Sequence, residues 1–163
     1  MTISMADAEA IVAHALSSAG ANPAMALATA RALVLAEAQG LSSHGLSRVS
    51  QYATHLRNGR VNGAAVPTLV SQRGGAALID AQEGLAFAAC DMAMQEAVAR
   101  ARTHGVAFVG VTNSHHCGVL VDHLRSAASA GLVALGLTNS PSAMPTAGGK
   151  HAMDRMDHGW MYA

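Results

Sequence analysis

The chain has 163 residues, of which 51% are hydrophobic and 12% charged, with 10 basic (Lys and Arg) and 10 acidic residues. This length suits one ordinary domain or part of a larger protein, and the composition excludes the polar, highly charged class of disordered chains. Lys150 is the only lysine. Because no basic surface could neutralise many phosphates, we expect no nucleic-acid partner.

The start of the chain lacks the basic stretch and uninterrupted apolar run of a secretory signal. No segment approaches the roughly 18 apolar residues that a membrane helix needs, so we expect no membrane partner and a cytoplasmic location. Cys90 and Cys117 could in principle form a disulfide, but a reducing compartment favours two thiols.

Three helices are predicted in the first part of the chain. Ser4 is a typical N-cap residue, and Asn22 is an N-cap followed by proline in the first turn. Apolar residues then recur at helical spacing to Gly20 and Gly40, and the short connection indicates an antiparallel pair. Residues 41–45 interrupt the pattern before a third helix begins at about Ser47 and stops at residues 58–59.

Strands and helices alternate beyond Gly63. The predicted strands cover residues 66–70, 76–79, 106–111 and 132–137, and the predicted helices cover 85–103 and 119–130. The continuous apolar runs indicate buried strands, and this order is typical of an α/β sheet whose faces are covered. We place the domain boundary near residues 60–66, with a helical domain over residues 1–62 and a second domain over 63–150.

The last segment, residues 151–163, differs from everything before it. It holds the only Trp, one of two Tyr and three of nine Met, but no Val, Leu or Ile. We therefore expect a tail that supplies no strand to the sheet. It is either a natural polar terminus or the product of a shifted reading frame.

His44 lies in a glycine-containing loop between two helices, beside Ser43. Its unperturbed pKa near neutrality suits a general acid or base. Arg48 follows four residues later and can face the same cavity, and its planar guanidinium suits a carboxylate. The alternatives are a surface histidine that caps a helix and an arginine on a solvated helix face.

A second candidate site is the run His115-His116-Cys117-Gly118, between a predicted strand and a helix start. Backbone N–H groups at a helix N-terminus favour an anion such as a cofactor phosphate, and Gly118 would let a ligand approach the backbone closely. With His123 the run also invites a zinc reading. Because no familiar zinc spacing is present, we expect no metal.

A third feature is a polar segment after the last predicted strand. Residues 138–141 (Thr-Asn-Ser-Pro) and 148–150 (Gly-Gly-Lys) either line a pocket or form only a turn. The sequence has no Gly-x-Gly-x-x-Gly fingerprint, no Walker loop and no Gly-x-Ser-x-Gly elbow. These patterns would indicate a Rossmann fold, a nucleotide phosphate loop or a serine hydrolase.

The separated motifs, in their order and spacing, resemble the malate/L-lactate dehydrogenase-like family of NAD(P)-dependent oxidoreductases. The resemblance runs from about residue 5 to Lys150 and rests on residues 43–45 with Arg48, residues 113–118, residues 138–141 and residues 148–150. Within the family, residues 43–49 look most similar to the Δ1-piperideine-2-carboxylate/Δ1-pyrroline-2-carboxylate reductases.

The resemblance implies a mixed α/β (α+β) fold in which an N-terminal helical segment precedes an incomplete, non-Rossmann cofactor domain with a mixed sheet and flanking helices. It implies that Ser43 and His44 form a relay that protonates the substrate and that Arg48 holds the substrate carboxylate. It also implies a homodimer. The residues implied to contact NADP or NAD are His116, Cys117, Gly118, Val119 and Leu120.

The implied reaction is hydride transfer from a reduced nicotinamide to C2 of a small 2-imino or 2-oxo carboxylate, with a cyclic imino acid favoured. The alternatives are a malate-, lactate- or ureidoglycolate-type 2-hydroxy acid dehydrogenase and a catalytically inactive fragment. Family members are considerably longer and continue with a Gly-Thr-Asn-Pro segment where this chain has residues 151–156. We therefore interpret the chain as truncated or frameshifted after Lys150.

Overall fold

The computed structural model describes residues 3–141 and 155–162. The chain divides into two compact units, Met1–Val119 and Leu120–Ala163, and each is described by itself. The first unit contains α1 (Met5–Ser18), α2 (Pro23–Ala38), the short 3-10 helices η1 (Ser42–His44) and η2 (Leu46–Arg48), α3 (Val49–Arg57), β1 (Thr68–Arg73), β2 (Ala76–Asp80), α4 (Phe87–His104) and β3 (Phe108–Thr112). The second unit contains α5 (Leu120–Ser129), β4 (Ala134–Pro141) and β5 (Arg155–Tyr162).

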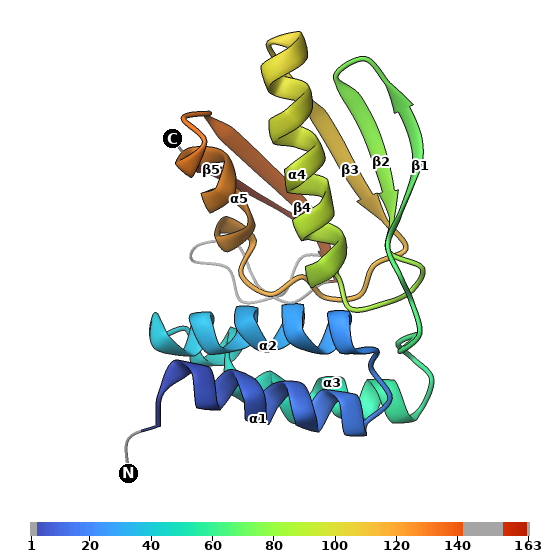
Figure 1. Cartoon of the computed structure of the whole chain (residues 1–163), viewed down its shortest axis with the longest axis vertical. Helices are drawn as coiled ribbons and strands as arrows, with labels where there is room; N and C mark the ends of the chain where they lie inside the picture. The colour runs from blue at the N-terminus through green and yellow to red at the C-terminus, as the bar shows by residue number, and fades with distance from the viewer. Residues whose placement is uncertain (1–2, 142–154, 163) are drawn as a thin grey trace. The chain divides into compact units, whose positions relative to one another are not determined.

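The helices α1, α2 and α3 form a helical layer in the first unit. Both predicted N-caps are confirmed: the Ser4 hydroxyl accepts from the Asp7 N–H at 3.1 Å, and the Asn22 side chain accepts from the Met25 N–H at 3.0 Å. Figure 1 shows α1 and α2 side by side in opposite directions, as predicted. Their shared core includes Val12, Leu16, Leu33, Tyr52, Leu56, Leu85 and Phe87.

That core crosses the predicted domain boundary. Leu85 and Phe87 belong to the start of α4 and its approach, yet they are buried with residues of α1, α2 and α3. The helical layer therefore shares its packing with the segment that follows it. The division near residues 60–66 stays a prediction.

The sheet of the first unit has the order β1-β2-β3. β1 pairs antiparallel with β2, and β2 pairs parallel with β3, so the mixed sheet that the family resemblance implies is confirmed. Figure 1 shows α4 lying along this sheet, and a second small core of Ile79, Ala81, Ala89 and Ala93 fills the interface. Gly105, with φ of 82°, ends α4 in the left-handed conformation that glycine favours.

The prediction of a fully buried strand over residues 106–111 is wrong. Val106 is 73% exposed and Phe108, the first residue of β3, is 77% exposed. A continuous apolar run is buried when both faces of its sheet are covered. Among the described elements of the first unit, α4 is the helix that packs on β2 and β3, so it covers one face.

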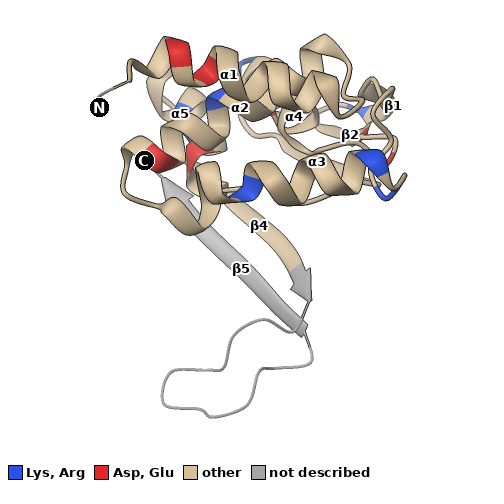
Figure 2. Ribbon diagram, turned by 90° about the horizontal axis from the view of Figure 1, so that it is seen from below, with Lys and Arg blue, Asp and Glu red and all other residues tan. Residues whose placement is uncertain are grey.

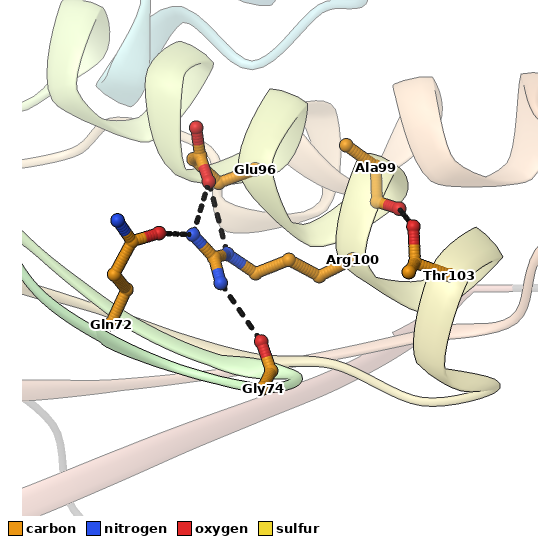
Figure 3. A network of polar contacts seen from close by, with 6 residues as sticks. All are labelled: Gln72, Gly74, Glu96, Ala99, Arg100 and Thr103. Atoms are coloured by element: carbon orange, nitrogen blue, oxygen red, sulfur yellow. Dashed lines mark hydrogen bonds and ion pairs between the residues drawn. The ribbon is translucent and has the colours of Figure 1, made fainter.

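One side chain fastens α4 to the β1–β2 hairpin (Figure 3). The Arg100 guanidinium donates to the backbone oxygen of Gly74 at 2.8 Å and to the side-chain oxygen of Gln72. On its own helix Arg100 pairs with Glu96, with 2.9 Å between Nη2 and Oε2. The arginine side chain is only 14% exposed, so these bonds satisfy a mostly buried cation.

The second unit corrects two predictions. β4 and β5 form an antiparallel ladder from Ala134 opposite Tyr162 to Pro141 opposite Arg155, so the tail supplies a strand. Its ladder uses backbone groups, and Trp and Tyr favour strands as Val and Ile do. Residues 138–141 form the end of β4 rather than a loop, and residues 148–150 lie outside the described residues.

The strand predicted over residues 132–137 is also not covered as expected. α5 packs on β4, but Leu135 and Leu137 are 64% and 68% exposed. Figure 2 shows charged positions of both signs on the described helices. Among the described residues, no helix is both long and apolar enough to cross a bilayer.

Candidate active site

The Ser42–Arg48 loop is fixed by a carboxylate from α2. Glu37 accepts the Ser42 hydroxyl at 2.8 Å through Oε1 and the Leu46 N–H at 2.9 Å through Oε2. These bonds tie η1 and η2 to the last turns of α2. A loop without regular α-helical hydrogen bonds thereby acquires a fixed shape.

Gly45 allows this close approach. A Cβ atom at this position would lie 2.4 Å from Oε2 of Glu37 and 3.0 Å from its backbone nitrogen. The φ of Gly45 is −96°, so backbone strain is not the reason for a glycine here. Contact with Glu37 is the physical reason for glycine directly after His44.

The predicted residues Ser43, His44 and Arg48 come together. The Ser43 hydroxyl lies 3.0 Å from Nδ1 of His44, and the Arg48 Nε–H donates to the Ser43 backbone oxygen at 2.6 Å. Arg48 also donates to the Gln51 side chain at 2.9 Å. Within the described part of the chain no carboxylate forms an ion pair with Arg48, which leaves its charge for an anionic ligand.

The loop after β3 brings His116 to the same place. The His44 and His116 rings are stacked, with 5.7 Å between centroids and 29° between planes. The loop is anchored where Glu83 donates its N–H to the Asn113 oxygen at 2.7 Å and His115 donates to the Gly84 oxygen at 3.0 Å. The two candidate sites of the sequence are therefore one site.

Burial and the arginine charge keep these histidines neutral. Desolvation and then the Arg48 cation lower the pKa of His44 below its ordinary 6.5. The pKa of His116 falls to about 4 through desolvation, followed by Arg48, His44 and His115. Although much of the His116 side chain is exposed, its Nδ1 edge is covered. At neutral pH the pair can accept hydrogen bonds or protons.

Gly118 has a packing reason to be glycine, and the predicted approach of a ligand to its backbone stays a prediction. Its φ is 71°, and a Cβ atom there would lie 2.7 Å from Cε1 of Phe87. The turn and the packing against the Phe87 ring therefore explain the glycine. Val119 ends the first unit, and Leu120 is the first residue of α5 in the second.

Two site residues, Tyr52 and His55, were not anticipated from the sequence. The Tyr52 hydroxyl lies 2.7 Å from Nδ1 of His116, and Nδ1 of His55 lies 3.0 Å from Nε2 of His115. Arg48, Tyr52 and His55 are spaced by four and three residues, so they share one helix face. That spacing of polar-tipped side chains is the sequence signal that could have found them.

Burial keeps the Cys90 thiol protonated. Burial, with Cys117 and Asp91 adding to it, raises the pKa of Cys90 to about 12. Cys90 and Cys117 form no disulfide with one another. In the part of the chain that the structure describes, no three His, Cys, Asp or Glu side chains are grouped as a metal site.

Comparison with known proteins identifies the class. The sequence pattern of the malate/L-lactate dehydrogenase family matches residues 3–154. The chain is 40% identical over 151 residues to the NADP(+)-dependent (2R)-3-sulfolactate dehydrogenase of Chromohalobacter salexigens, covering 93% of this chain and 45% of that protein. It is 36% identical over 121 residues to a Δ1-pyrroline-2-carboxylate/Δ1-piperideine-2-carboxylate reductase of Pseudomonas putida, covering 74% of this chain and 36% of that protein.

Solved structures agree. The sulfolactate dehydrogenase of Methanocaldococcus jannaschii superposes with a TM-score of 0.88 at 27% identity, covering 99% of this chain and 47% of that one. The Δ1-piperideine-2-carboxylate reductase of Pseudomonas syringae gives a TM-score of 0.82 at 30% identity, covering 86% and 42%. The fold and the matched sequence are those of a non-Rossmann family of dehydrogenases and reductases. The chain belongs to the malate/L-lactate dehydrogenase family, and it spans less than half the length of these relatives.

Proposed function

We propose that this chain supplies one wall of the active site of an NAD(P)-dependent oxidoreductase that acts at C2 of a small carboxylate. The observation that carries the proposal is Arg48, a partly buried cation that no described carboxylate neutralises, beside the hydrogen-bonded pair of Ser43 and His44. The arginine fork suits a carboxylate, and the imidazole suits proton transfer at the neighbouring carbon's oxygen or nitrogen.

His44 would carry the proton and Ser43 would hold the ring. The lowered pKa of His44 favours the neutral form, which accepts a proton when a 2-hydroxy acid is oxidised. A substrate carboxylate at Arg48 would offset the cation that helps to lower this pKa, so binding would favour protonated His44. The protonated ring could then return the proton in the reducing direction.

The donor set also fits a nicotinamide cofactor. The backbone N–H groups of His116 and Val119, which precede the first turn of α5, suit a phosphate or the carboxamide. Arg48 is kept for the substrate carboxylate, and the Gly118 N–H is bonded to His116. When bound, the nicotinamide would supply or accept the hydride. Cys117, Gly118, Val119 and Leu120 remain proposed cofactor contacts beside His116, and NADP and NAD are both candidates because relatives are named for each.

We favour a cyclic imino acid such as Δ1-piperideine-2-carboxylate as substrate, because residues 43–49 look like those of the imino acid reductases. A 2-hydroxy acid is the alternative, favoured by the 40% identity to a sulfolactate dehydrogenase. A homodimer, implied by the family, and a cytoplasmic location are further proposals. The alternative to all these proposals is that this chain is catalytically inactive.

A nucleotide fluorescence titration and a turnover assay test this proposal. We expect saturable binding of NADPH or NADH and reduction of an imino acid, with His44→Ala lowering turnover by at least about 100-fold, the lower range for a lost general acid. His14→Ala, on the exposed side of α1, is the control. Near-normal turnover of His44→Ala would remove His44 from the reaction, and absence of nucleotide binding would favour the inactive chain.

A further inference from the structure

His116 receives two hydrogen bonds at a single nitrogen. The Gly118 N–H donates to Nδ1 at 3.1 Å, and the Tyr52 hydroxyl lies 2.7 Å from the same atom. A backbone N–H can only donate, so Nδ1 must present its lone pair and carry no proton. The Tyr52 hydroxyl is then the second donor.

Tyr52 is well placed for this task. It is only 1% exposed and packs in the helical core, and its ring lies tilted 6.2 Å from the Phe87 ring. Burial raises the pKa of its hydroxyl, so the phenol keeps the proton that it donates. α3 therefore delivers a rigid hydrogen-bond donor from the core to the edge of the site.

The remaining nitrogen, Nε2, must carry the proton of the neutral ring. Nε2 lies on nearly the opposite side of the imidazole from Nδ1, and within the described residues no group accepts from it. The charged and titratable groups that act on His116 are Arg48, His44 and His115, with the Tyr52 hydroxyl bonded to it, and none of these is a carboxylate that would pull the proton to Nδ1.

We propose that Tyr52 is a positioning residue that, with the Gly118 amide, locks His116 in the neutral Nε2–H tautomer, so that His116 offers a hydrogen-bond donor beside His44. The inference rests on the proposed function for its ligand, a carbonyl or carboxylate oxygen of cofactor or substrate. It assigns the two stacked histidines different tasks. His44 transfers the proton, and His116 holds an oxygen.

Long-range proton–nitrogen NMR of the histidine-labelled chain at pH 7 reads the tautomer directly. His116→Gln identifies the His116 signals among the nine histidines. We expect Nδ1 to show the shift of an unprotonated nitrogen and Nε2 that of a protonated one. A protonated Nδ1, or an equal mixture of tautomers, overturns the proposal.

Tyr52→Phe removes the phenol and keeps the ring. We expect the Nδ1–H tautomer to become populated and the pKa of His116 to move upward by about one pH unit, since a donor to the neutral form is lost. Leu56→Val is the matched control, because it loosens the core around α3 but removes no hydroxyl. A Tyr52→Phe spectrum that matches the wild type, or an equal change in Leu56→Val, also overturns the proposal.

These readouts do not need a bound nucleotide. If the chain fails to bind NADPH but His116 shows the Nε2–H tautomer, the proposed function fails and the role of Tyr52 stands. If the nucleotide binds and His116 carries its proton on Nδ1, the proposed function stands and the role of Tyr52 fails. Separate additions of NADPH and of pyrroline-2-carboxylate show which ligand shifts the Nε2–H signal.

Discussion

Single side chains in this site act through charge as much as through contact. Arg48 lowers the pKa of both His44 and His116, although its own hydrogen bonds go to Ser43 and Gln51. After burial, which is the larger cause, this one cation lowers the pKa of two rings, and it remains available for a ligand. This coupling ties substrate binding to proton transfer, because an anion at Arg48 changes the charge that both histidines feel.

Arg48→Gln should raise the pKa of His44 and of His116, since removing a nearby cation favours the protonated imidazoles. NMR titration of the ring signals measures both values. Arg57→Gln, at the end of α3, should leave them unchanged. Equal effects of the two substitutions would mean that overall charge, and not the position of Arg48, governs the histidines.

The sequence predicted those site residues that local patterns reveal. His44 and Arg48 stand in one loop at a spacing that can be read directly, and the structure brings them together. Tyr52 lies within the predicted third helix and is buried in the core. Its hydroxyl meets His116, 64 residues away in the sequence, and a contact of that kind depends on tertiary packing that no local pattern encodes.

At the scale of elements, the ends of helices were easier to predict than the burial and pairing of strands. The Ser4 and Asn22 caps satisfy backbone donors within three residues, so their effect is local. The exposure of Phe108 and the pairing of β5 depend instead on what lies across the sheet. Whether a segment forms a strand depends on the residues across the sheet. Those residues cannot be read from residues 151–163 themselves, so no strand was predicted there.

Arg100 joins elements and should matter for stability. Arg100→Met would remove donors to the Gly74 oxygen, to Gln72 and to Glu96 while keeping much of the apolar stem. We expect a loss of about 1–2 kcal/mol in the free energy of unfolding, because hydrogen bonds from a charged donor are lost while their exposed acceptors can bond to water instead. Urea denaturation measures this loss, with the exposed Arg102→Met as control. A difference under about 0.5 kcal/mol, the usual range for surface changes, would contradict this role.

At the scale of the whole chain, large apolar side chains from predicted interior strands lie at the surface of the described residues. Val106 and Phe108 in the first unit, and Leu135 and Leu137 in the second, all stand more than half exposed. The chain spans 45% of the length of its sulfolactate dehydrogenase relative. The same strands that sequence patterns mark as interior are thus surface here, and the helical layer is where this chain buries its largest core.

The histidines of the site make the free energy of unfolding depend on pH. Folding lowers the pKa of His44, His115 and His116, the last from 6.5 to about 4. Between these values the unfolded chain binds more protons than the folded chain, so the free energy of unfolding falls as the pH drops from about 6.5 to about 4. Above this window the rings are neutral in both states, and their contribution is complete.

Melting temperatures measured across this window test the coupling. We expect His116→Gln to flatten the dependence of Tm on pH relative to the wild type, because the substituted chain has one fewer group whose pKa folding lowers. The carboxylates titrate in the same pH range in every variant, so their contribution to the dependence of Tm on pH cancels when two variants are compared. His14→Gln, which changes an exposed histidine of α1, should keep the wild-type slope. Parallel curves for His116→Gln and the wild type would show that the ring is protonated as readily in the folded chain as in the unfolded one. The hydrogen bonds at Nδ1, including that of Tyr52, would then leave the pKa of His116 unchanged.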